Sequence, residues 1–563
     1  MNGKALTPAL SHPMGEGESS PAWSNNGRLH LQGGCPQNKE LPTAVPSPIE
    51  WERVRVRVCF TFLCIVFSFS LSALAAPKNI LLIIADDYGA DASVLYNSTN
   101  NGAQLPPTPN IVSLAQKGVV FANVYANPVC SPTRACLITG RHSFRTGVGD
   151  AITAGSPVLQ ASEFTLPEAF NASGLGYHLA QFGKWHLALG PNTPLTVGGW
   201  TNFAGSIPGA VSSYTDWAKT VNGSTTANYT NYATTDVVND AIAWIHARGT
   251  NPWLAWVAFN AAHTPLHKPP ANLAPHYASL PGTPFDINNN PADYFDAMIE
   301  AMDTEIGRLL AAVNLTNTHV IFLGDNGTSS ATLQPPYPSG RGKSTLYEGG
   351  IKVPMIIAGP AVMSPGRTNT TIVHAVDLFA TILELAGTSV AATVPANVVV
   401  DSRSIVPALL GTPDPSRRVY AELFGDNLLN GQDGRMLRDA RYKLIRFTDG
   451  HDEFYDLQTD PYEGRNLVST LTSDQRQYYD RLQFWLYGYS TNTGPRIASA
   501  SGSNGQFSCT LTQTANYALW RCDDLTTTFW AQVTNAIATT NGPTVTLTDV
   551  SPPATRAFYG VVK

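Results

Sequence analysis

The chain has 563 residues, of which 43% are hydrophobic and only 13% are charged. This length is too great for one small core and predicts two to four domains, and the composition is typical of a packed globular protein. The formal net charge of -6, with no basic stripe along the chain, argues against nucleic acid as a partner.

The first 75 residues precede the region in which we expect a fold. Residues 1–50 are rich in Pro, Gly and Ser and lack hydrophobic periodicity, so we interpret them as disordered or as an upstream extension. Residues 51–75 place three arginines before an apolar run that ends in Ala73-Leu74-Ala75, the layout of a secretory signal peptide. The run is nearly long enough to span a membrane, but its small-residue ending favours cleavage.

We therefore expect an exported protein, periplasmic or extracellular, with no stable membrane insertion after cleavage; a retained signal anchor is the alternative. Cleavage would leave four cysteines in the mature chain, namely Cys130, Cys136, Cys509 and Cys522. The last two lie close together in the sequence and are suited to form one disulfide in an oxidising compartment. The first two have no such explanation.

Five short apolar segments punctuate residues 79–360, and four of them end in polar side chains. They are "NILLIIADD" (79–87), "YHLAQFGKWH" (177–186), "WLAWVAFNAAHTPLH" (253–267), "THVIFLGDNG" (318–327) and "VPMIIAGP" (353–360), the last of which closes with a turn. Helical segments such as 108–118 and 293–313 lie between them. This alternation predicts an α/β fold with a large, buried, mostly parallel or mixed sheet between helices.

Ligand sites in such sheets lie beyond the carboxyl ends of the strands. Each polar pair alone fits a helix cap or a turn, and a lone histidine is more often structural than catalytic. Their shared position at strand ends favours one site. The residues that we expect to converge there are Asp86, Asp87, Lys184, His186, His263, Asp325 and Asn326.

The stretch Cys130-Ser131-Pro132-Thr133-Arg134, followed by Thr139-Gly140-Arg141, resembles the signature of the type I sulfatases of the alkaline-phosphatase-like superfamily. The similarity extends from about Asn79 to Leu467. Further motifs appear in the family's order, namely "GKWHL", "AAHTPLHKP", "GDNG", "GRGKSTLYEGGIKVPMI" and "HDEFYDLQTDPYEGRNL". The resemblance implies a sulfuric ester hydrolase of the arylsulfatase type.

In the family resembled, the motif cysteine is oxidised to formylglycine by a formylglycine-generating enzyme, which would explain Cys130. One hydroxyl of the hydrated aldehyde attacks sulfur, and the second hydroxyl then expels sulfate. The resemblance further implies that Arg134 and Lys184 stabilise this group and that Lys343 neutralises the sulfate oxygens. It gives His186 the role of base in sulfate release and His263 the role of acid toward the leaving alcohol.

The oxygen-rich residues also predict a metal site. Asp86, Asp87, Asp325 and Asn326 offer hard oxygen ligands without His or Cys, which favours one Ca²⁺ ion, or less well Mg²⁺, over zinc. The modified residue 130 would be a further ligand. Ser131 and Pro132 are typical of the cap and first turn of a helix, whose amides and dipole would favour negative charge at residue 130.

The expected organisation is a catalytic domain at 76–415, a small C-terminal antiparallel α+β subdomain at 416–490, and a linker with a β-rich tail module at 491–563. In the subdomain, "RYKLIRF" and "DEFYDL" predict strands, and 473–489 predicts a closing helix.

The leading hypothesis is a secreted, Ca²⁺-dependent sulfatase that hydrolyses sulfate monoesters of a sulfated small molecule or, more specifically, a sulfated glycan. Two alternatives remain, a phosphate or phosphonate monoester hydrolase of the same superfamily and a non-catalytic secreted glycan-binding protein. The loop 198–217 follows the family only up to Phe203, so it does not identify the substrate.

Overall fold

The computed structural model of the chain describes residues 10–12, 77–425 and 433–490, and seven short stretches between 497 and 562. The predicted signal peptide at 51–75 therefore lies outside the described residues, as does nearly all of 1–50. No helix in the described part is both long and apolar enough to cross a bilayer.

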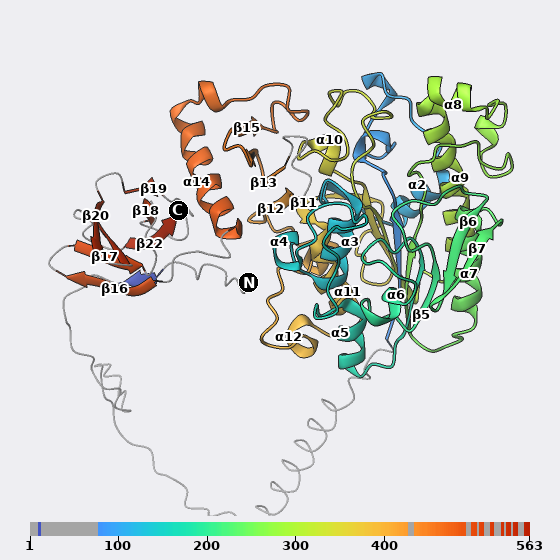
Figure 1. Cartoon of the computed structure of the whole chain (residues 1–563), viewed down its shortest axis with the longest axis horizontal. Coiled ribbons are helices and arrows are strands. Elements are labelled where there is room, and N and C mark those ends of the chain that lie inside the picture. Colours follow the sequence, from blue (N-terminus) through green and yellow to red (C-terminus); the bar gives the residue numbers. More distant parts are fainter. Residues whose placement is uncertain are drawn as a thin grey trace, which may run out of the picture. The chain divides into compact units, whose positions relative to one another are not determined.

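A ten-stranded sheet runs through the larger part of the structure, with the strand order β11-β3-β10-β9-β2-β8-β4-β5-β6-β7 (Figure 1). Its strands are β2 (Asn79–Ala85), β3 (Gly118–Tyr125), β4 (His178–Gly183), β5 (Asn202–Gly205), β6 (Trp217–Val221), β7 (Ser224–Tyr229), β8 (Trp253–Ala258), β9 (Thr318–Gly324), β10 (Met355–Ala358) and β11 (Arg367–His374). Neighbours β9, β2, β8, β4 and β5 are parallel, whereas β10, β6 and β7 run antiparallel to the strands beside them. The predicted mixed α/β sheet is confirmed.

The direction of β10 explains why the segment 353–360 ends in a turn. It pairs antiparallel with both β9 and β3. Its carboxyl end therefore lies at the edge of the sheet opposite to the ends of β9 and β2, which carry the polar pairs.

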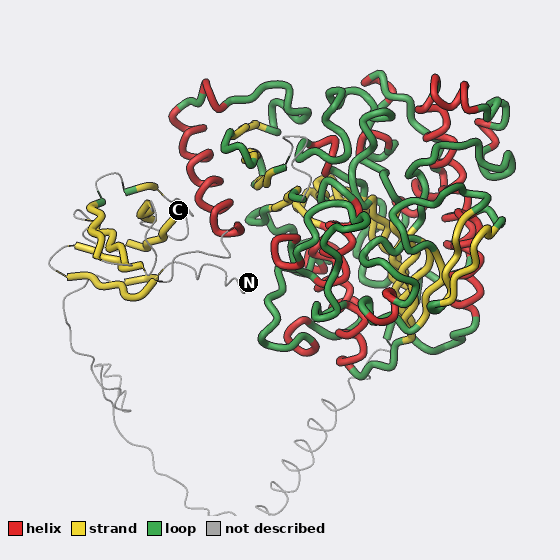
Figure 2. The backbone as a smooth tube through the Cα atoms, in the orientation of Figure 1, coloured by secondary structure: helices red, strands yellow, loops and turns green. Residues whose placement is uncertain are grey.

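Helices cover both faces of this sheet (Figure 2). The described α-helices are α2 (Pro109–Gln116), α3 (Cys130–Thr139), α4 (Ser143–Thr146), α5 (Leu166–Ser173), α6 (Thr193–Thr196), α7 (Ala233–His246), α8 (Pro284–Asn289), α9 (Pro291–Ala311), α10 (Glu348–Ile351), α11 (Leu378–Leu385), α12 (Val390–Thr393), α13 (Val406–Leu409) and α14 (Ser473–Ser490). The helices predicted at 108–118, 293–313 and 473–489 are confirmed as α2, α9 and α14.

Strand β2 shows how the two hydrophobic cores form. Side chains of successive strand residues point to opposite faces, so the all-apolar strand feeds both layers. Ile80, Leu82 and Ile84 pack in one core with residues of α3, α5 and α11. Leu81 and Ile83 pack in the other core with residues of α2, α7 and α9. The strand is buried on both faces, which holds its carboxyl end in place.

A second, antiparallel sheet follows in the order β12-β13-β14-β15, with α14 packed on β13 and β14. Its strands are β12 (Val419–Leu423), β13 (Gly434–Arg438), β14 (Tyr442–Phe447) and β15 (Asp452–Asp456). The predicted strands at 441–447 and 452–457 are confirmed. The boundary that we expect at 415/416 falls between α13 and β12, and it stays a prediction.

The described stretches of the tail, together with Leu10–His12 from the N-terminal region, form strands in two further four-stranded sheets, of orders β16-β17-β21-β20 and β1-β22-β18-β19. The strands are β1 (Leu10–His12), β16 (Ile497–Ser503), β17 (Gln506–Leu511), β18 (Ala518–Cys522), β19 (Ala531–Gln532), β20 (Ile537–Asn541), β21 (Thr544–Asp549) and β22 (Ala557–Val562). The side chains of Cys509 and Cys522 lie outside the described residues, so their disulfide stays a prediction.

Buried charges join the two main sheets. Lys443 of β14 is fully buried, and its Nζ lies 3.1 Å from Glu348 Oε1 of α10 and 2.7 Å from Glu463 Oε1. Glu463 Oε2 also accepts a hydrogen bond of 2.6 Å from the Glu348 backbone amide. Tyr125 of β3 donates to Glu348 Oε2 over 2.8 Å. One ammonium thus lies between two buried carboxylates that come from different parts of the fold.

We expect the Lys443→Met substitution to destabilise the protein by about 3–5 kcal/mol, because it leaves the buried Glu463 carboxylate without its ion-pair partner and Glu348 with the more distant Lys352 Nζ at 3.8 Å. The methionine side chain is similar in length to that of lysine, so the loss of stability reports the removal of the positive charge. Arg476→Ala is the control, since it removes an exposed i,i+4 ion pair with Asp480 on α14 and should cost less than about 1 kcal/mol. Denaturant-induced unfolding measures both; equal losses would contradict the role given to Lys443.

Candidate functional site

Four neighbouring parallel strands, in the order β9-β2-β8-β4, end at one edge of the large sheet. Asp86 and Asp87 follow β2, and Asp325 and Asn326 follow β9. Lys184 and His186 follow β4, and His263 lies five residues after β8. Helix α3 brings Cys130 and Arg134 to the same place, and the segment before α10 brings Lys343. The expected convergence of strand-end residues is therefore observed.

Each of three buried carboxylates faces one cation. Lys184 Nζ lies 2.5 Å from Asp86 Oδ2, and Lys343 Nζ lies 2.5 Å from Asp87 Oδ1. The Arg134 guanidinium donates twice to Asp325 Oδ2, from Nη2 at 2.8 Å and from Nε at 3.0 Å. The three pairs balance in formal charge, and a buried charge without such a partner would be very costly.

The oxygen atoms of this cluster fit a metal ion. Asp86, Asp87 and Asp325 each place one carboxylate oxygen within 4.8 Å of the others. Two further observations point the same way, because the buried Asp86 Oδ1 and Asn326 Oδ1 have no hydrogen-bond partner among the described residues. A buried oxygen without a partner costs about 1–3 kcal/mol. A hard divalent cation would satisfy both oxygens.

The pKa values of the carboxyl groups agree with this interpretation. Burial raises the pKa of Asp86 to about 6, although Lys184 opposes the shift. Burial also raises the pKa of Asp325, with a contribution from Asp86. Burial acts on Asp87 in the same direction, but Lys343 and His263 outweigh it and hold its pKa below the usual value. The cationic partners of Asp86 and Asp325 therefore do not fully offset the cost of burying these two carboxylates in their charged form.

Two site residues adopt left-handed backbone conformations directly after their strands. Asp87 has φ 57° and His186 has φ 53°. Such conformations cost of order 1–3 kcal/mol and are tolerated where the surroundings enforce them. At Asp87 and His186 they occur where the chain leaves β2 and β4 and enters the site.

Cys130 is the first residue of α3 and is buried. Its Sγ lies 3.1 Å from His186 Nδ1, and His186 Nε2 lies 3.0 Å from the Ile152 carbonyl oxygen. Because a carbonyl can only accept, Nε2 carries a proton and Nδ1 presents its lone pair to residue 130. Burial, with help from Lys184, lowers the pKa of His186 to about 3, so the ring is neutral near pH 7.

The helix begins as predicted but is not capped as predicted. The residue before the first turn is Val129, which offers no side-chain cap. Ser131 lies inside the helix, and its Oγ donates to the His186 carbonyl at 2.9 Å and accepts from the Ile152 amide at 3.1 Å. The prediction of Ser131 as the cap was wrong, because this hydroxyl bonds to the backbone around His186 instead of to its own helix.

His263 is held by the opposite ring nitrogen. Its Nδ1 lies 2.9 Å from the Thr264 carbonyl oxygen, so Nδ1 carries a proton and Nε2 is the nitrogen that can exchange one. Nε2 lies 4.0 Å from Asp87 Oδ2, and the side chain is 18% exposed. Burial and Lys184 lower the pKa of His263, while Asp87 opposes the shift.

Lys343 lies at the more open side of the cluster, with 16% of its side chain exposed. Burial lowers its pKa, but the Asp87 carboxylate more than offsets this effect and raises the pKa above its ordinary value. The ammonium is therefore charged near pH 7, and it can meet an anion.

Sequence reasoning missed several residues that shape this site. Asn260 and Ser206 bond to each other beneath the site, with Asn260 Nδ2 3.1 Å from Ser206 Oγ. The Tyr214 hydroxyl contacts the turn that carries His263. No motif marks these residues, since their partners are backbone carbonyls or side chains about 50 residues away.

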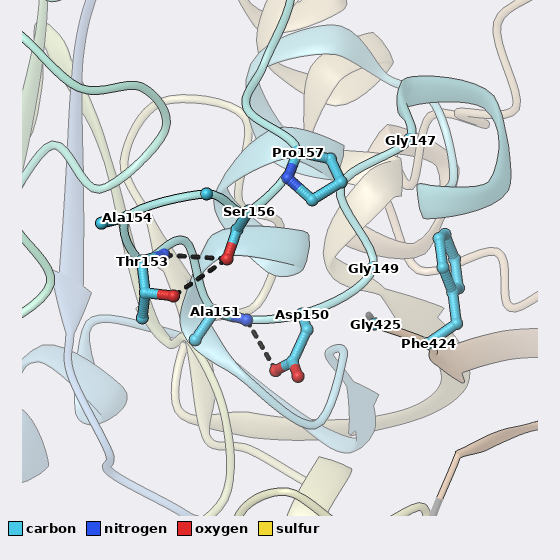
Figure 3. A pocket seen from close by; sticks show the side chains of 11 residues that line it. Gly147, Gly149, Asp150, Ala151, Thr153, Ala154, Ser156, Pro157, Phe424 and Gly425 are labelled. Carbon is cyan, nitrogen blue, oxygen red and sulfur yellow. Dashed lines mark hydrogen bonds between the residues drawn. The ribbon is translucent and has the colours of Figure 1, made fainter. Parts of the chain in front are cut away.

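A pocket of about 450 Å³ adjoins this region (Figure 3). Ala151 and Thr153 line it, and Ile152 between them contacts both His186 and Ser131. Thr153 and Ser156 are hydrogen-bonded to each other in its wall, and Phe424 lies across from them. Asp150 is its charged lining residue, with no Lys, Arg or His among the described residues that line it.

Comparisons with known proteins agree with this geometry. Residues 78–388 match the sulfatase family, and residues 342–483 match the C-terminal family of N-sulphoglucosamine sulphohydrolase. The N-acetylgalactosamine-6-sulfatase of Mus musculus is 30% identical over 460 residues, which cover 74% of this chain and 81% of the relative.

Two solved structures show the same fold. The structure of Ps i-CgsB in complex with k-i-k-neocarrahexaose matches with a TM-score of 0.63 at 23% identity, over 74% of this chain and 94% of that one. The structure of BT4656 in complex with its substrate D-glucosamine-2-N,6-O-disulfate matches with a TM-score of 0.60 at 21% identity, over 74% of this chain and all of that one.

We expect a divalent cation to bind at the carboxylate cluster and Asn326→Ala to weaken that binding by roughly tenfold or more, because the substitution removes a buried oxygen that has no protein partner. Calorimetric titration of chelator-treated protein with Ca²⁺ measures the affinity. Asn317→Ala is the matched control, since Asn317 is exposed at the other end of β9. Unchanged affinity in the Asn326 variant would contradict the site.

Proposed function

Because the chain belongs to the sulfatase family and is a sulfuric ester hydrolase, we propose that residue 130 is its nucleophile and that it acts on a sulfate monoester of a carbohydrate. The observation that carries the proposal is the contact of Cys130 Sγ with His186 Nδ1 at 3.1 Å, beside three buried carboxylates and three cations.

Formylglycine at position 130 would supply a hydrated aldehyde, one hydroxyl of which attacks sulfur while the other expels sulfate. The cysteine sulfur marks where this group would lie. It is at the N-terminus of the ten-residue helix α3, whose free amides and dipole favour negative charge. Arg134 lies one helical turn further on, paired with Asp325, and we assign it and Lys184 to the stabilisation of residue 130.

A Ca²⁺ ion held by Asp86, Asp87, Asp325 and Asn326 would supply a Lewis acid and a template for the sulfate oxygens. The ion would also change the charge of the site. The three carboxylates and the three cations sum to zero, so a divalent ion leaves an excess of two positive charges. A deprotonated hydroxyl of residue 130 would offset one of these charges, and the remaining single positive charge fits the monoanion of a sulfate ester. Lys343 at the open side is the residue that we assign to the sulfate oxygens.

The two histidines suit opposite proton transfers. His186 is neutral and directs the lone pair of Nδ1 at residue 130, so it can take the proton of a hydroxyl there when sulfate leaves. His263 can donate a proton from Nε2 to the leaving alcohol oxygen. The negative sulfate group bound beside His263 would favour its protonated form, against the lowering of its pKa by burial.

The proposal of a sulfated glycan rests on the relatives and on the pocket beside His186. The relative from Mus musculus is named for N-acetylgalactosamine 6-sulfate, and two structures of this fold hold carbohydrates. The pocket offers hydroxyls, an aromatic ring and one carboxylate. Asp150 can accept hydrogen bonds from sugar hydroxyls and would repel a second sulfate, so we assign the pocket to an uncharged part of the substrate.

Maturation follows from the same proposal. A formylglycine-generating enzyme would act on Cys130 before the fold buries it, and the signal at 51–75 would then direct the protein to the periplasm or the cell exterior. There the enzyme would encounter its substrate, a sulfated small molecule or glycan.

We expect active protein to contain formylglycine at position 130 and a cysteine at position 136. Peptide mass spectrometry distinguishes the two residues of α3. Cys130→Ser should abolish multiple turnover, because serine lacks the second hydroxyl. Cys136→Ser is the control and should retain activity, since Cys136 Sγ is hydrogen-bonded to Asn127 and Ser143 in the helix packing. Unmodified Cys130 in fully active enzyme would contradict the proposal.

We expect kcat/KM for an aryl sulfate to exceed that for the phosphate and phosphonate esters of the same phenol. A phosphate monoester is largely a dianion near pH 7, and the limited positive charge of the site suits a monoanion better. The preference belongs to the transition state, so kcat/KM is the quantity to compare. Protein of known formylglycine and metal content is required. A higher phosphate or phosphonate value would favour the alternative hydrolase.

A further inference from the structure

The segment 206–214, between β5 and β6, contacts the chain around both histidines. The Ser206 carbonyl accepts from the Trp185 amide at 2.9 Å, and the Ile207 carbonyl accepts from the His186 amide at 3.0 Å. Gly209 lies against the imidazole, because a Cβ added there would be 2.3 Å from His186 Cε1. Only glycine fits this approach. The segment therefore holds the backbone and the ring of His186.

The same segment ends at the turn that carries His263. Tyr214 is 2% exposed, and its Oη lies 2.6 Å from the Asn260 carbonyl oxygen and 2.7 Å from the His263 carbonyl oxygen. These carbonyls belong to the two ends of one turn, which is closed by a bond of 2.9 Å from the His263 amide to Asn260 O. The Tyr214 hydroxyl is thus within hydrogen-bonding distance of the carbonyl oxygens at both ends of the turn.

The opposite side of this turn is bonded to Asp86. The Asp86 amide donates to Ala261 O at 3.0 Å, and the Ala262 amide donates to Asp86 O at 2.7 Å. The turn is therefore held between the backbone of Asp86 on one side and the hydroxyl of Tyr214 on the other. Removal of the hydroxyl would free one side of the turn and deprive the His263 carbonyl of this donor, whereas the Asn260 carbonyl would keep its bond from the His263 amide.

We propose that Tyr214 is a positioning residue for His263, acting on the protonation of the leaving alcohol through the turn 260–263. The inference rests on the acid role proposed for His263. General acid catalysis depends on the distance between the donor nitrogen and the leaving oxygen, and a displacement of about 1 Å can cost 10²-fold in rate. The need for this proton grows as the leaving alcohol becomes more basic.

The test uses Tyr214→Phe, which keeps the ring and removes only the hydroxyl. We expect kcat/KM for phenyl sulfate, whose leaving group needs a proton, to fall roughly tenfold or more. For 4-nitrophenyl sulfate, whose leaving group is stable as an anion, we expect a loss of less than about threefold. The ratio of the two losses separates poor proton donation from general damage to the site.

Three further variants make the result decisive. His263→Ala should show the same selective loss, only larger. Tyr232→Phe is the matched control, because Tyr232 Oη contacts His267 Nε2 at 3.0 Å in the same aromatic group, and within the described part of the chain no hydrogen bond joins this hydroxyl to residues 260–263. Replacement of Tyr214 by 3-fluorotyrosine keeps the hydroxyl, so the ratio of kcat/KM for the two aryl sulfates should equal that of the wild type. This variant also provides a test if Tyr214→Phe folds poorly.

The outcomes distinguish the inference from the function on which it rests. If His263→Ala lowers kcat/KM equally for phenyl sulfate and for 4-nitrophenyl sulfate, the acid role of His263 is wrong. If His263→Ala is selective but Tyr214→Phe is not, or if 3-fluorotyrosine fails to restore the ratio, the positioning role of Tyr214 is wrong. Equal effects of Tyr214→Phe and Tyr232→Phe would also overturn it.

Discussion

The burial of three carboxylates at one edge of the sheet is the constraint on which the site depends. Asp86, Asp87 and Asp325 are at most 4% exposed, and each carboxylate requires its own cation. The fold supplies these cations from three separate segments, namely α3, the end of β4 and the segment before α10. The relative positions of Arg134, Lys184 and Lys343 are therefore set by charge pairing and not by loop packing alone.

Buried charge also links the C-terminal sheet to this arrangement. Lys343 and Glu348 are five residues apart, and Glu348 is held by Lys443 of β14. The segment between them is further fixed by the Lys343 amide, which donates to Thr328 O at 2.8 Å, and by the Ser344 amide, which donates to Pro128 O at 2.9 Å. The antiparallel subdomain thus contributes to the site without placing a side chain in the carboxylate cluster.

The sequence carried the information for the strand ends but not for the contacts between them. Apolar runs such as 79–85 are readable because a strand buried on both faces admits few other residues, and the polar residues that follow then mark the edge of the sheet. The sequence of β10 contains no comparable pattern from which its antiparallel direction could be predicted. The sequence around Ser131 is typical of a helix cap. Only the structure shows that the Ser131 hydroxyl bonds instead to the backbone around His186.

Backbone carbonyls, which no sequence pattern displays, decide how the two histidines differ. Ile152 O holds Nε2 of His186, and Thr264 O holds Nδ1 of His263, so the rings present opposite nitrogens to the space between them. One ring faces residue 130 as a neutral acceptor, and the other faces the more open side near Asp87. Since segment 206–214 contacts the chain at both rings, a change in this loop would alter the positions of both histidines together.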